Sequence, residues 1–321
     1  MSKSLICWKT AKSKFTGLAG ARSGMGRRNV TSCTSIEKNR ENAKATRTRK
    51  TNRQTARKRK RRRNKKPKKK RIPTDRCSRY RHGKAFHLMS TTFDKIAENL
   101  KRIRGEIEEA CATSNRDPGE VKLVAVTKYA QDEWVQALID MGVSELGESR
   151  PQQLVPRADQ FDDKVTWHMI GHLQRNKVRP VLPIAQLIHS VDTLKLLSRV
   201  DLIAGDIGLK PSVLLEVNIS GEESKHGFSK TELLEQWEEV VSQERVNIRG
   251  LMTMAPRTDS ADEAISVFEE LRELRDELST KHPHGPTLAE LSMGMSNDFP
   301  AAIKAGATII RVGSRLYDGL C

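Results

Sequence analysis

The chain has 321 residues, with 58 Lys and Arg against 40 Asp and Glu, and a formal net charge of +18. Residues 1–88 hold 31 of the basic and three of the acidic residues, so this segment carries +28 and the remainder −10. The five cysteines form no Cys-x-x-Cys pair, no signal-peptide pattern is present, and no apolar run approaches the roughly 20 residues of a membrane span. These features argue against a disulfide scaffold, a cysteine-ligated zinc site and a membrane protein, and we expect a soluble, cytoplasmic one.

Residues 1–88 have the composition of a disordered basic arm. They contain few apolar residues, no sustained periodicity and the run RKRKRRRNKKPKKKR at 57–71, and such a segment cannot bury a core. If translated, the arm would bind nucleic acid without sequence preference and with strong salt dependence. We favour a simpler explanation, in which translation begins at Met89, because the Ser-Thr-Thr sequence that follows offers helix-capping residues.

Residues 89–321 suffice for one well-buried domain. A helix is expected over residues 90–114, where apolar residues recur at intervals of three and four. Strands and helices alternate after it. The eight expected strands are 121–127, 143–147, 165–171, 186–192, 212–220, 246–254, 287–294 and 307–313. The expected helices between them include 132–141, 193–204, 230–242, 261–280 and 297–305.

This alternation predicts parallel strands joined by right-handed crossovers, and eight such units favour a single (β/α)8 TIM-type barrel. An open doubly wound sheet is the alternative. Such a sheet normally carries a glycine fingerprint after its first strand, whereas this chain has TKYAQD there, without a glycine. In a barrel, we expect functional side chains at the C-terminal strand ends and a phosphate site after strands seven and eight.

The first strand, LVAVTKYA, carries Lys128 at its end. A lysine amine whose pKa is lowered by desolvation or by nearby positive charge is a nucleophile, and it forms a Schiff base with an aldehyde. The turns SMGMSND and RVGS, after strands seven and eight, offer N–H groups and hydroxyls to a phosphate. An aldehyde that carries its own phosphate is pyridoxal 5′-phosphate. For Lys128 alone, a strand-end lysine that simply reaches solvent is the simpler explanation.

Longer segments carry a resemblance to a known family. LVAVTKYA, LGESRPQQL, WHMIGHLQRNK, IHSVD, VLLEVNISGEESKHGF, GLMTMAP and LSMGMSNDFPAAIKAGATIIRVGSRLYDG follow one another in its order and spacing. The chain resembles the pyridoxal phosphate homeostasis protein family (YggS/PROSC type) from about residue 89 onward. That family has a barrel like that of alanine racemase, and the resemblance implies binding of pyridoxal 5′-phosphate without an established catalytic activity.

The resemblance also implies particular site residues. The eight that it places at the cofactor are Lys128, Ser149, His168, Met252, Ser296, Arg311, Gly313 and Ser314. Lys128 would form the internal aldimine, Ser296, Gly313 and Ser314 would hold the phosphate, and Arg311 would face the pyridine nitrogen. His168 and Met252 would lie in the cofactor pocket.

Two positions depart from the usual family pattern, and one histidine pair suggests an alternative. Ser149 stands where the family usually has asparagine, so a contact with the cofactor ring is lost or passes to water. Ser314 replaces a usual threonine and keeps the hydroxyl. His168 and His172 are four residues apart, a spacing that suggests a metal pair on a helix, but here they flank the end of a strand, so we expect no metal site.

The expected function is to hold pyridoxal 5′-phosphate and deliver it to apo-enzymes, without substantial catalysis, as a monomer or weak dimer. The alternatives are an amino-acid racemase that uses the same cofactor and a nucleic-acid-associated protein that acts through the basic arm. Racemisation needs acid–base groups on both faces of the substrate carbon. Alanine racemase takes the second from a further domain, and we expect this chain, which ends eight residues after Gly313, to lack it.

Overall fold

The chain forms two units, Met1–Asp75 and Arg76–Cys321. The structure, a computed structural model, describes residues 79–161, 165–222, 224–256, 261–282 and 285–320. Most of the arm that we expected to be disordered therefore lies outside the described residues.

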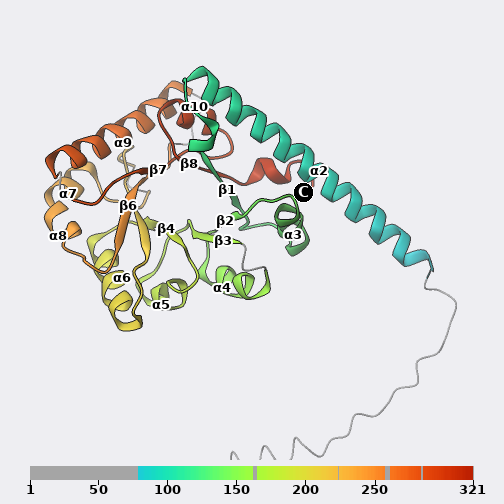
Figure 1. The fold of residues 1–321 in the computed structure, drawn as a ribbon, viewed down its shortest axis with the longest axis horizontal. Coiled ribbons are helices and arrows are strands. Elements are labelled where there is room, and N and C mark those ends of the chain that lie inside the picture. The colour runs from blue at the N-terminus through green and yellow to red at the C-terminus, as the bar shows by residue number, and fades with distance from the viewer. Residues whose placement is uncertain (1–78, 162–164, 223, 257–260, 283–284, 321) are drawn as a thin grey trace, which may run out of the picture. The chain divides into compact units, whose positions relative to one another are not determined.

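Eight parallel strands close into a barrel in sequence order (Figure 1). The strands are β1 (Lys122–Val126), β2 (Glu145–Glu148), β3 (Thr166–Met169), β4 (Leu187–Val191), β5 (Ser212–Glu216), β6 (Asn247–Met252), β7 (Glu290–Ser292) and β8 (Ile309–Val312). β8 closes the barrel by pairing with β1, with Ile310 opposite Leu123. The predicted (β/α)8 barrel is therefore confirmed. The open sheet is excluded, because in an open sheet β1 and β8 would not pair with each other.

Helices outside the strands form a second layer (Figure 1). They are α3 (Asp132–Asp140), α4 (Pro151–Gln160), α5 (Val178–Val181), α6 (Leu194–Ile207), α7 (Lys230–Glu235), α8 (Trp237–Val241), α9 (Ala261–Lys281) and α10 (Phe299–Lys304), with 3-10 turns η1 (Pro118–Glu120), η2 (Arg175–Lys177) and η3 (Ser314–Tyr317). The single helix expected over 230–242 is two helices, which meet at Gln236. Within the described ranges, no helix combines the length and apolarity that crossing a membrane requires.

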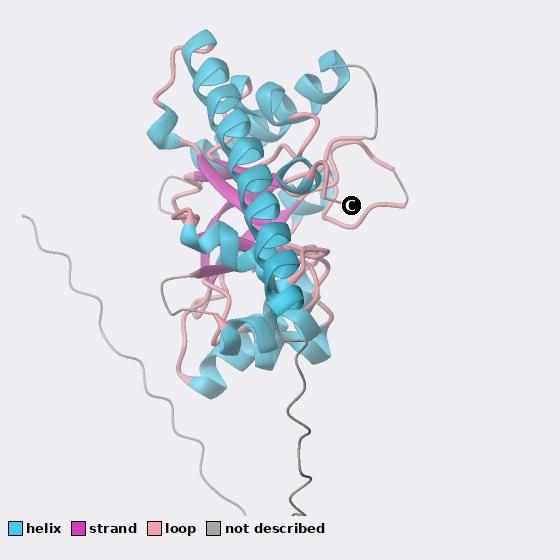
Figure 2. Ribbon diagram, turned by 90° about the vertical axis from the view of Figure 1, so that its right-hand side faces the viewer, coloured by secondary structure: helices cyan, strands magenta, loops and turns pink. Residues whose placement is uncertain are grey.

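The leading helix, α2 (Arg79–Thr113), is longer than expected and lies along the outside of the barrel (Figure 2). It begins at Arg79, so Ser90 lies inside the helix and not at its cap, and residues 79–88 form helical turns where we expected disorder. α2 packs against α3, α10 and η3. Its buried Asn99 donates hydrogen bonds to the carbonyl oxygens of Leu316, at 3.1 Å, and Asp318, at 2.9 Å.

The barrel interior is apolar at one level and polar at the next. Alternate residues of a strand point to the same side. One cluster of buried apolar side chains consists of Val124, Leu187, Leu214, Met252 and Ile309. Two residues further along β4, β5 and β8 come the buried polar side chains of His189, Glu216 and Arg311. This polar layer therefore lies between the apolar cluster and the C-terminal end of the strands.

Candidate functional site

A cavity of about 1160 Å³ opens at the C-terminal end of β1 and β8. Five of the eight residues predicted to bind the cofactor line it. They are Lys128, Ser296, Arg311, Gly313 and Ser314. The barrel therefore brings together an amine, two hydroxyls and a guanidinium from segments that lie far apart in the sequence.

Lys128 lies in the turn that follows β1. The backbone N–H of Ala130 donates to the carbonyl oxygen of Thr127 at 2.9 Å and closes this turn. Thr127 is buried and Lys128 exposed, so the buried run stops one residue before the amine. The Lys128 Nζ lies 5.1 Å from the centre of the Tyr129 ring. The apolar strand ends in a lysine because the chain turns there into the cavity mouth.

A buried arginine of α4 holds both ends of this turn. Arg157 Nη1 donates to the carbonyl oxygen of Thr127 and Nη2 to that of Ala130, each at 2.6 Å. Nη1 also donates to Glu148 Oε2 at 2.8 Å, and the Thr127 hydroxyl donates to the same oxygen at 3.0 Å. The backbone on both sides of Lys128 is therefore fixed, while the lysine side chain remains exposed.

The turns after β7 and β8 meet on another wall of the cavity. The backbone N–H of Gly313 donates to Ser296 Oγ at 3.2 Å. Gly294 has a φ of +89°, and a Cβ there would lie 2.6 Å from Ala302 Cβ, so this turn requires glycine. Ser314 begins η3, and the first N–H groups of a helical turn have no partner inside it. These turns offer hydroxyls and N–H groups to an anion.

The short helix α10 adds little to this anion site. It has six residues, and an aspartate, Asp298, is its N-cap. A negative charge there opposes the binding of an anion at the N-terminus of this helix. Arg315 forms a bidentate ion pair with Glu106 of α2 and donates to the carbonyl oxygen of Ser296 at 3.4 Å. The loops, and not the helix, therefore carry the hydroxyl and N–H groups that this wall of the cavity presents.

Arg311 is a buried side chain that reaches the cavity from β8. Its Nη1 donates to Ser292 Oγ at 2.6 Å and its Nη2 to the carbonyl oxygen of Thr253 at 3.0 Å. Burial lowers the pKa of Arg311 to about 10, while the charges of Glu216 and Asp298 act in the opposite direction. The guanidinium therefore stays charged at neutral pH.

A chain of hydrogen bonds leads from Arg311 through the barrel interior. Beyond Ser292, the hydroxyl lies 2.8 Å from His189 Nδ1, His189 Nε2 lies 2.9 Å from His168 Nδ1, and His168 Nε2 lies 2.6 Å from Glu145 Oε2. Arg311 only donates and an ionised Glu145 only accepts, so that, with one proton on each histidine, every group between them donates toward Glu145. This direction assigns the Nε2–H tautomer to both histidines.

The electrostatics of the barrel interior agree with that assignment. Burial lowers the pKa of His189 well below its ordinary value, and the charges of His168 and Arg311 act in the same direction, so His189 is neutral. Burial raises the pKa of Glu145, but its hydrogen bond with His168 and the charges of His168 and Lys122 bring it below its ordinary value, so Glu145 is ionised. The hydrogen-bonded chain thus joins the Arg311 guanidinium to the Glu145 carboxylate, and it passes through a neutral His189.

Glu216 is the other titratable group in the polar layer. Burial, and then the charge of Asp192, raise the pKa of Glu216 to about 7, while Arg311 opposes the shift. Glu216 is therefore protonated below neutral pH and ionised above it. The net charge near Arg311 changes across this range.

Three predicted cofactor residues do not line the cavity. Ser149 is half-buried after β2, Met252 belongs to the apolar cluster inside the barrel, and His168 lies within the hydrogen-bonded chain. Their contacts with a cofactor stay predictions. His168 and His172 also have different partners, because His172 Nδ1 lies 3.0 Å from Asp192 Oδ2 at the mouth.

Sequence reasoning missed the residues that hold the site in place. His189 stood inside the expected strand IHSV, and a buried polar side chain there requires a partner, which was a usable signal. Arg157 gave no such signal, because α4 was not predicted. The cause was two prolines, Pro151 and Pro156. Pro151 is the first residue of α4, where the missing N–H costs nothing because an N–H at that position has no partner within the helix.

Known proteins match the barrel part of the chain in sequence. The family model described as "Alanine racemase, N-terminal domain" matches residues 92–320. The pyridoxal phosphate homeostasis protein of Aquifex aeolicus (strain VF5) is 36% identical over 221 residues, which cover 68% of this chain and 96% of that protein. The protein of the same name from Pseudomonas aeruginosa is 38% identical over 224 residues, covering 69% and 94%.

A solved structure gives the same result. The structure of PipY from Synechococcus elongatus PCC7942, with PLP bound, is 34% identical to this chain and superposes with a TM-score of 0.62. The match covers 69% of this chain and 99% of PipY. Since the family model and the relatives match the same barrel, the chain belongs to the pyridoxal phosphate homeostasis protein family.

Proposed function

We propose that the chain binds pyridoxal 5′-phosphate in this cavity, holds it and delivers it to apo-enzymes, without substantial catalysis. One observation carries the proposal: a single cavity joins the Lys128 amine, the Ser296 and Ser314 turns and the buried Arg311. The cofactor has three groups that match these features: its aldehyde would meet the amine, its phosphate the two turns and its ring nitrogen the guanidinium. Its aldehyde supplies covalent attachment to an amine. The names of the relatives and the PLP bound to PipY support this assignment.

The accessibility of the lysine supports delivery. Lys128 is exposed, and the cavity of about 1160 Å³ exceeds the ~300–1000 Å³ typical of pockets that enclose a drug-sized ligand. A second molecule that bears an amine can therefore reach the aldehyde carbon of the cofactor, to which Lys128 would be attached. This arrangement favours exchange of the cofactor over its permanent retention.

Arg311 supports a protein with little catalysis. Carbanion chemistry on this cofactor is favoured when the ring nitrogen is protonated. The Arg311 guanidinium remains charged and only donates hydrogen bonds, so it disfavours a proton on a nitrogen that it faces. Tyr317, which also lines the cavity, donates its hydroxyl to the carbonyl oxygen of Val126 at 3.2 Å, and burial raises its pKa. Tyr317 therefore keeps its proton and cannot take one from a substrate.

The attachment is tested by absorption spectroscopy of the purified protein titrated with pyridoxal 5′-phosphate. We expect a visible band that borohydride removes, and we expect Lys128→Ala to abolish it. Lys304→Ala is the matched control, because Lys304 is also exposed and lines the same cavity. If Lys128→Ala still gives a borohydride-trapped cofactor on the same peptide, another lysine forms the bond.

The phosphate site is tested separately. Ser296→Ala and Ser314→Ala should each weaken cofactor affinity by about 1 to 3 kcal/mol, the scale for loss of a hydrogen bond to a charged group. Neither should change the spectrum at saturation. An unchanged affinity in the double variant would place the phosphate elsewhere.

Delivery and catalysis need their own measurements. The loaded protein, mixed with an apo-enzyme that depends on this cofactor, should restore its activity even when a scavenger removes free cofactor. L- and D-alanine in deuterium oxide should exchange their α-hydrogen very slowly with stoichiometric protein. Exchange or inversion near about 1 per second, within the usual range of enzyme turnover, would instead support the racemase alternative.

A further inference from the structure

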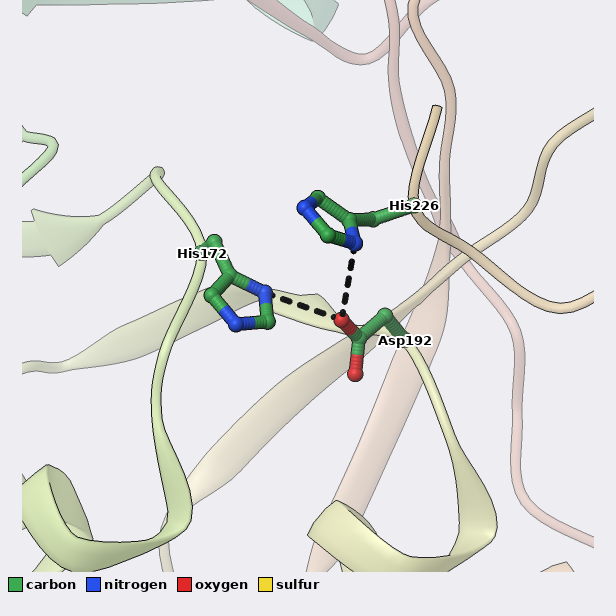
Figure 3. A group of neighbouring side chains, drawn as sticks. All are labelled: His172, Asp192 and His226. Carbon is green, nitrogen blue, oxygen red and sulfur yellow. Dashed lines mark hydrogen bonds and ion pairs between the residues drawn. The ribbon is translucent and has the colours of Figure 1, made fainter. Parts of the chain in front are cut away.

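Three side chains with metal-binding atoms meet at the barrel mouth, on the side of β3, β4 and β5 (Figure 3). His172 follows β3, Asp192 follows β4 directly and His226 lies in the loop after β5. Their nearest ligand atoms all lie within 4.8 Å of one another. In Figure 3, both imidazole rings direct a nitrogen toward the same carboxylate oxygen, with His172 Nδ1 at 3.0 Å and His226 Nδ1 at 4.0 Å from Asp192 Oδ2.

The carboxylate is fixed before any ion arrives. The side chain of Asp192 is only 7% exposed. Its other oxygen, Oδ1, accepts a hydrogen bond from the Thr193 hydroxyl at 3.2 Å, and the same hydroxyl caps α6 by accepting from the N–H of Leu196. Partners of this kind orient the ligands of metal sites. Oδ2 is thereby left to face the two histidines.

The backbone also holds the two histidines in place. Next to His172, the carbonyl oxygen of Gly171 accepts from the Ser190 hydroxyl at 2.6 Å. Next to His226, Gly227 has a φ of +122°, and a Cβ there would lie 2.8 Å from the Asn218 nitrogen. The loop after β5 therefore folds tightly against its own strand, while the side chains of His172 and His226 remain 43% and 63% exposed. The site has a fixed base and an open approach from solvent.

The donor set determines which ion fits. Two imidazoles and one carboxylate are typical of zinc and related transition metals, whereas magnesium and calcium prefer oxygen ligands. Tetrahedral ligands at about 2.0 to 2.1 Å from zinc lie roughly 3.3 Å apart, between the 3.0 and 4.0 Å observed here. The rings are stacked, with centroids 4.3 Å apart, so they must turn slightly to direct both lone pairs at one ion.

We propose that His172, Asp192 and His226 bind a divalent transition-metal ion of the zinc class. The site leaves a coordination position open to solvent, as sites that exchange or bind a further ligand do. The sequence did not predict it, because the residues come from three different loops. The inference does not depend on the cofactor assignment, since it concerns the opposite side of the mouth from β8.

The test uses the full chain, freed of metal with a chelator and of cofactor, because pyridoxal 5′-phosphate itself binds metals. Co2+ is titrated and its visible absorption followed, and Zn2+ is then added as a competitor. We expect one saturable site with a tetrahedral Co2+ spectrum that Zn2+ displaces. His226→Ala and His172→Ala should each weaken binding by at least about tenfold, and so should Asp192→Asn.

The matched control is His282→Ala, because His282 also pairs with a carboxylate, Glu238, at 3.2 Å, but among the described residues it belongs to no group of three metal-binding side chains. It should bind Co2+ like the wild type. Thermal melting checks that each variant is folded, and the two exposed histidines give independent substitutions. The proposal is overturned if the wild type shows no saturable site, or if His226→Ala and His172→Ala bind as tightly as the wild type. Binding that persists with thiolate charge-transfer bands would place the ion on cysteines instead.

Discussion

Two almost fully buried arginines balance their charge in different ways. Arg157 is 8% exposed and Arg311 is 5% exposed. Arg157 forms an ion pair with the buried carboxylate of Glu148 and bonds two backbone carbonyls. Arg311 gives its hydrogen bonds to a hydroxyl and a carbonyl, and Glu216 and Asp298 act on it through space.

The difference separates a structural arginine from one that is available to a ligand. A guanidinium in direct contact with a carboxylate has little attraction left for another partner, and Arg157 is used to fix the turn that carries Lys128. The Arg311 charge is not cancelled by contact, and it borders the cavity. Arg157 of α4 therefore supports the cavity without lining it, whereas Arg311 of β8 lines it.

The largest expected effect on stability comes from replacing Arg157. Arg157→Met should lower the free energy of unfolding by about 3 to 5 kcal/mol, because it leaves the Glu148 carboxylate buried without its partner. Denaturant unfolding measures this change. A double variant, Arg157→Met with Glu148→Met, removes both charges and should recover much of the loss.

Arg179→Ala is the control for that comparison. Arg179 forms an exposed ion pair with Asp206 at 2.6 Å, and such pairs contribute about 1 kcal/mol or less. If Arg157→Met costs no more than this control, then Arg157 does not hold the turn, and the distinction between the two arginines disappears.

The next effect concerns the charge that balances Arg311. The pKa of Glu216 is raised to about 7, so the folded state holds this proton more tightly than the unfolded state does. Its contribution to stability is complete below about pH 4.5 and is lost as the pH rises through 7, by up to about 3 kcal/mol. Unfolding measured from pH 4 to 8 should show this loss in the wild type and not in Glu216→Gln. Equal slopes for both proteins would show that Glu216 titrates normally.

The smallest expected effect is a break in the hydrogen-bonded chain. Ser292→Ala should cost about 1 to 3 kcal/mol, because both Arg311 Nη1 and His189 Nδ1 lose a buried partner. Nitrogen NMR of the wild type should show the Nε2–H tautomer for His168 and His189, and the variant should lose the fixed tautomer of His189. Ser190→Ala, which removes a single bond to a carbonyl, is the control. A mixture of tautomers in the wild type would contradict the one-way chain.

The sequence predicts what depends on local pattern. The apolar run before Lys128 and the glycine-containing turn around Ser296 indicated strand ends and an anion site, because these signals lie within a few residues. The partner of Glu148 was not predictable, because Arg157 comes from a helix that starts with proline. The helix start at Arg79 was also not predicted, because the basic residues there have no apolar periodicity. His189 and Ser292 required the register of strands that are 103 residues apart.

The closing contacts of the barrel set the order in which the site can form. Lys128 follows β1, Gly313 and Ser314 follow β8, and these strands pair only when the barrel closes. Asn99 of α2 adds bonds to Leu316 and Asp318 that span 217 and 219 residues. Contacts this distant in sequence cannot form until both segments have been made, and they require the closure of a long loop. During synthesis, the lysine is thus made long before the turns that would hold a phosphate, so a nascent chain cannot capture the cofactor at both ends until its last strand is in place.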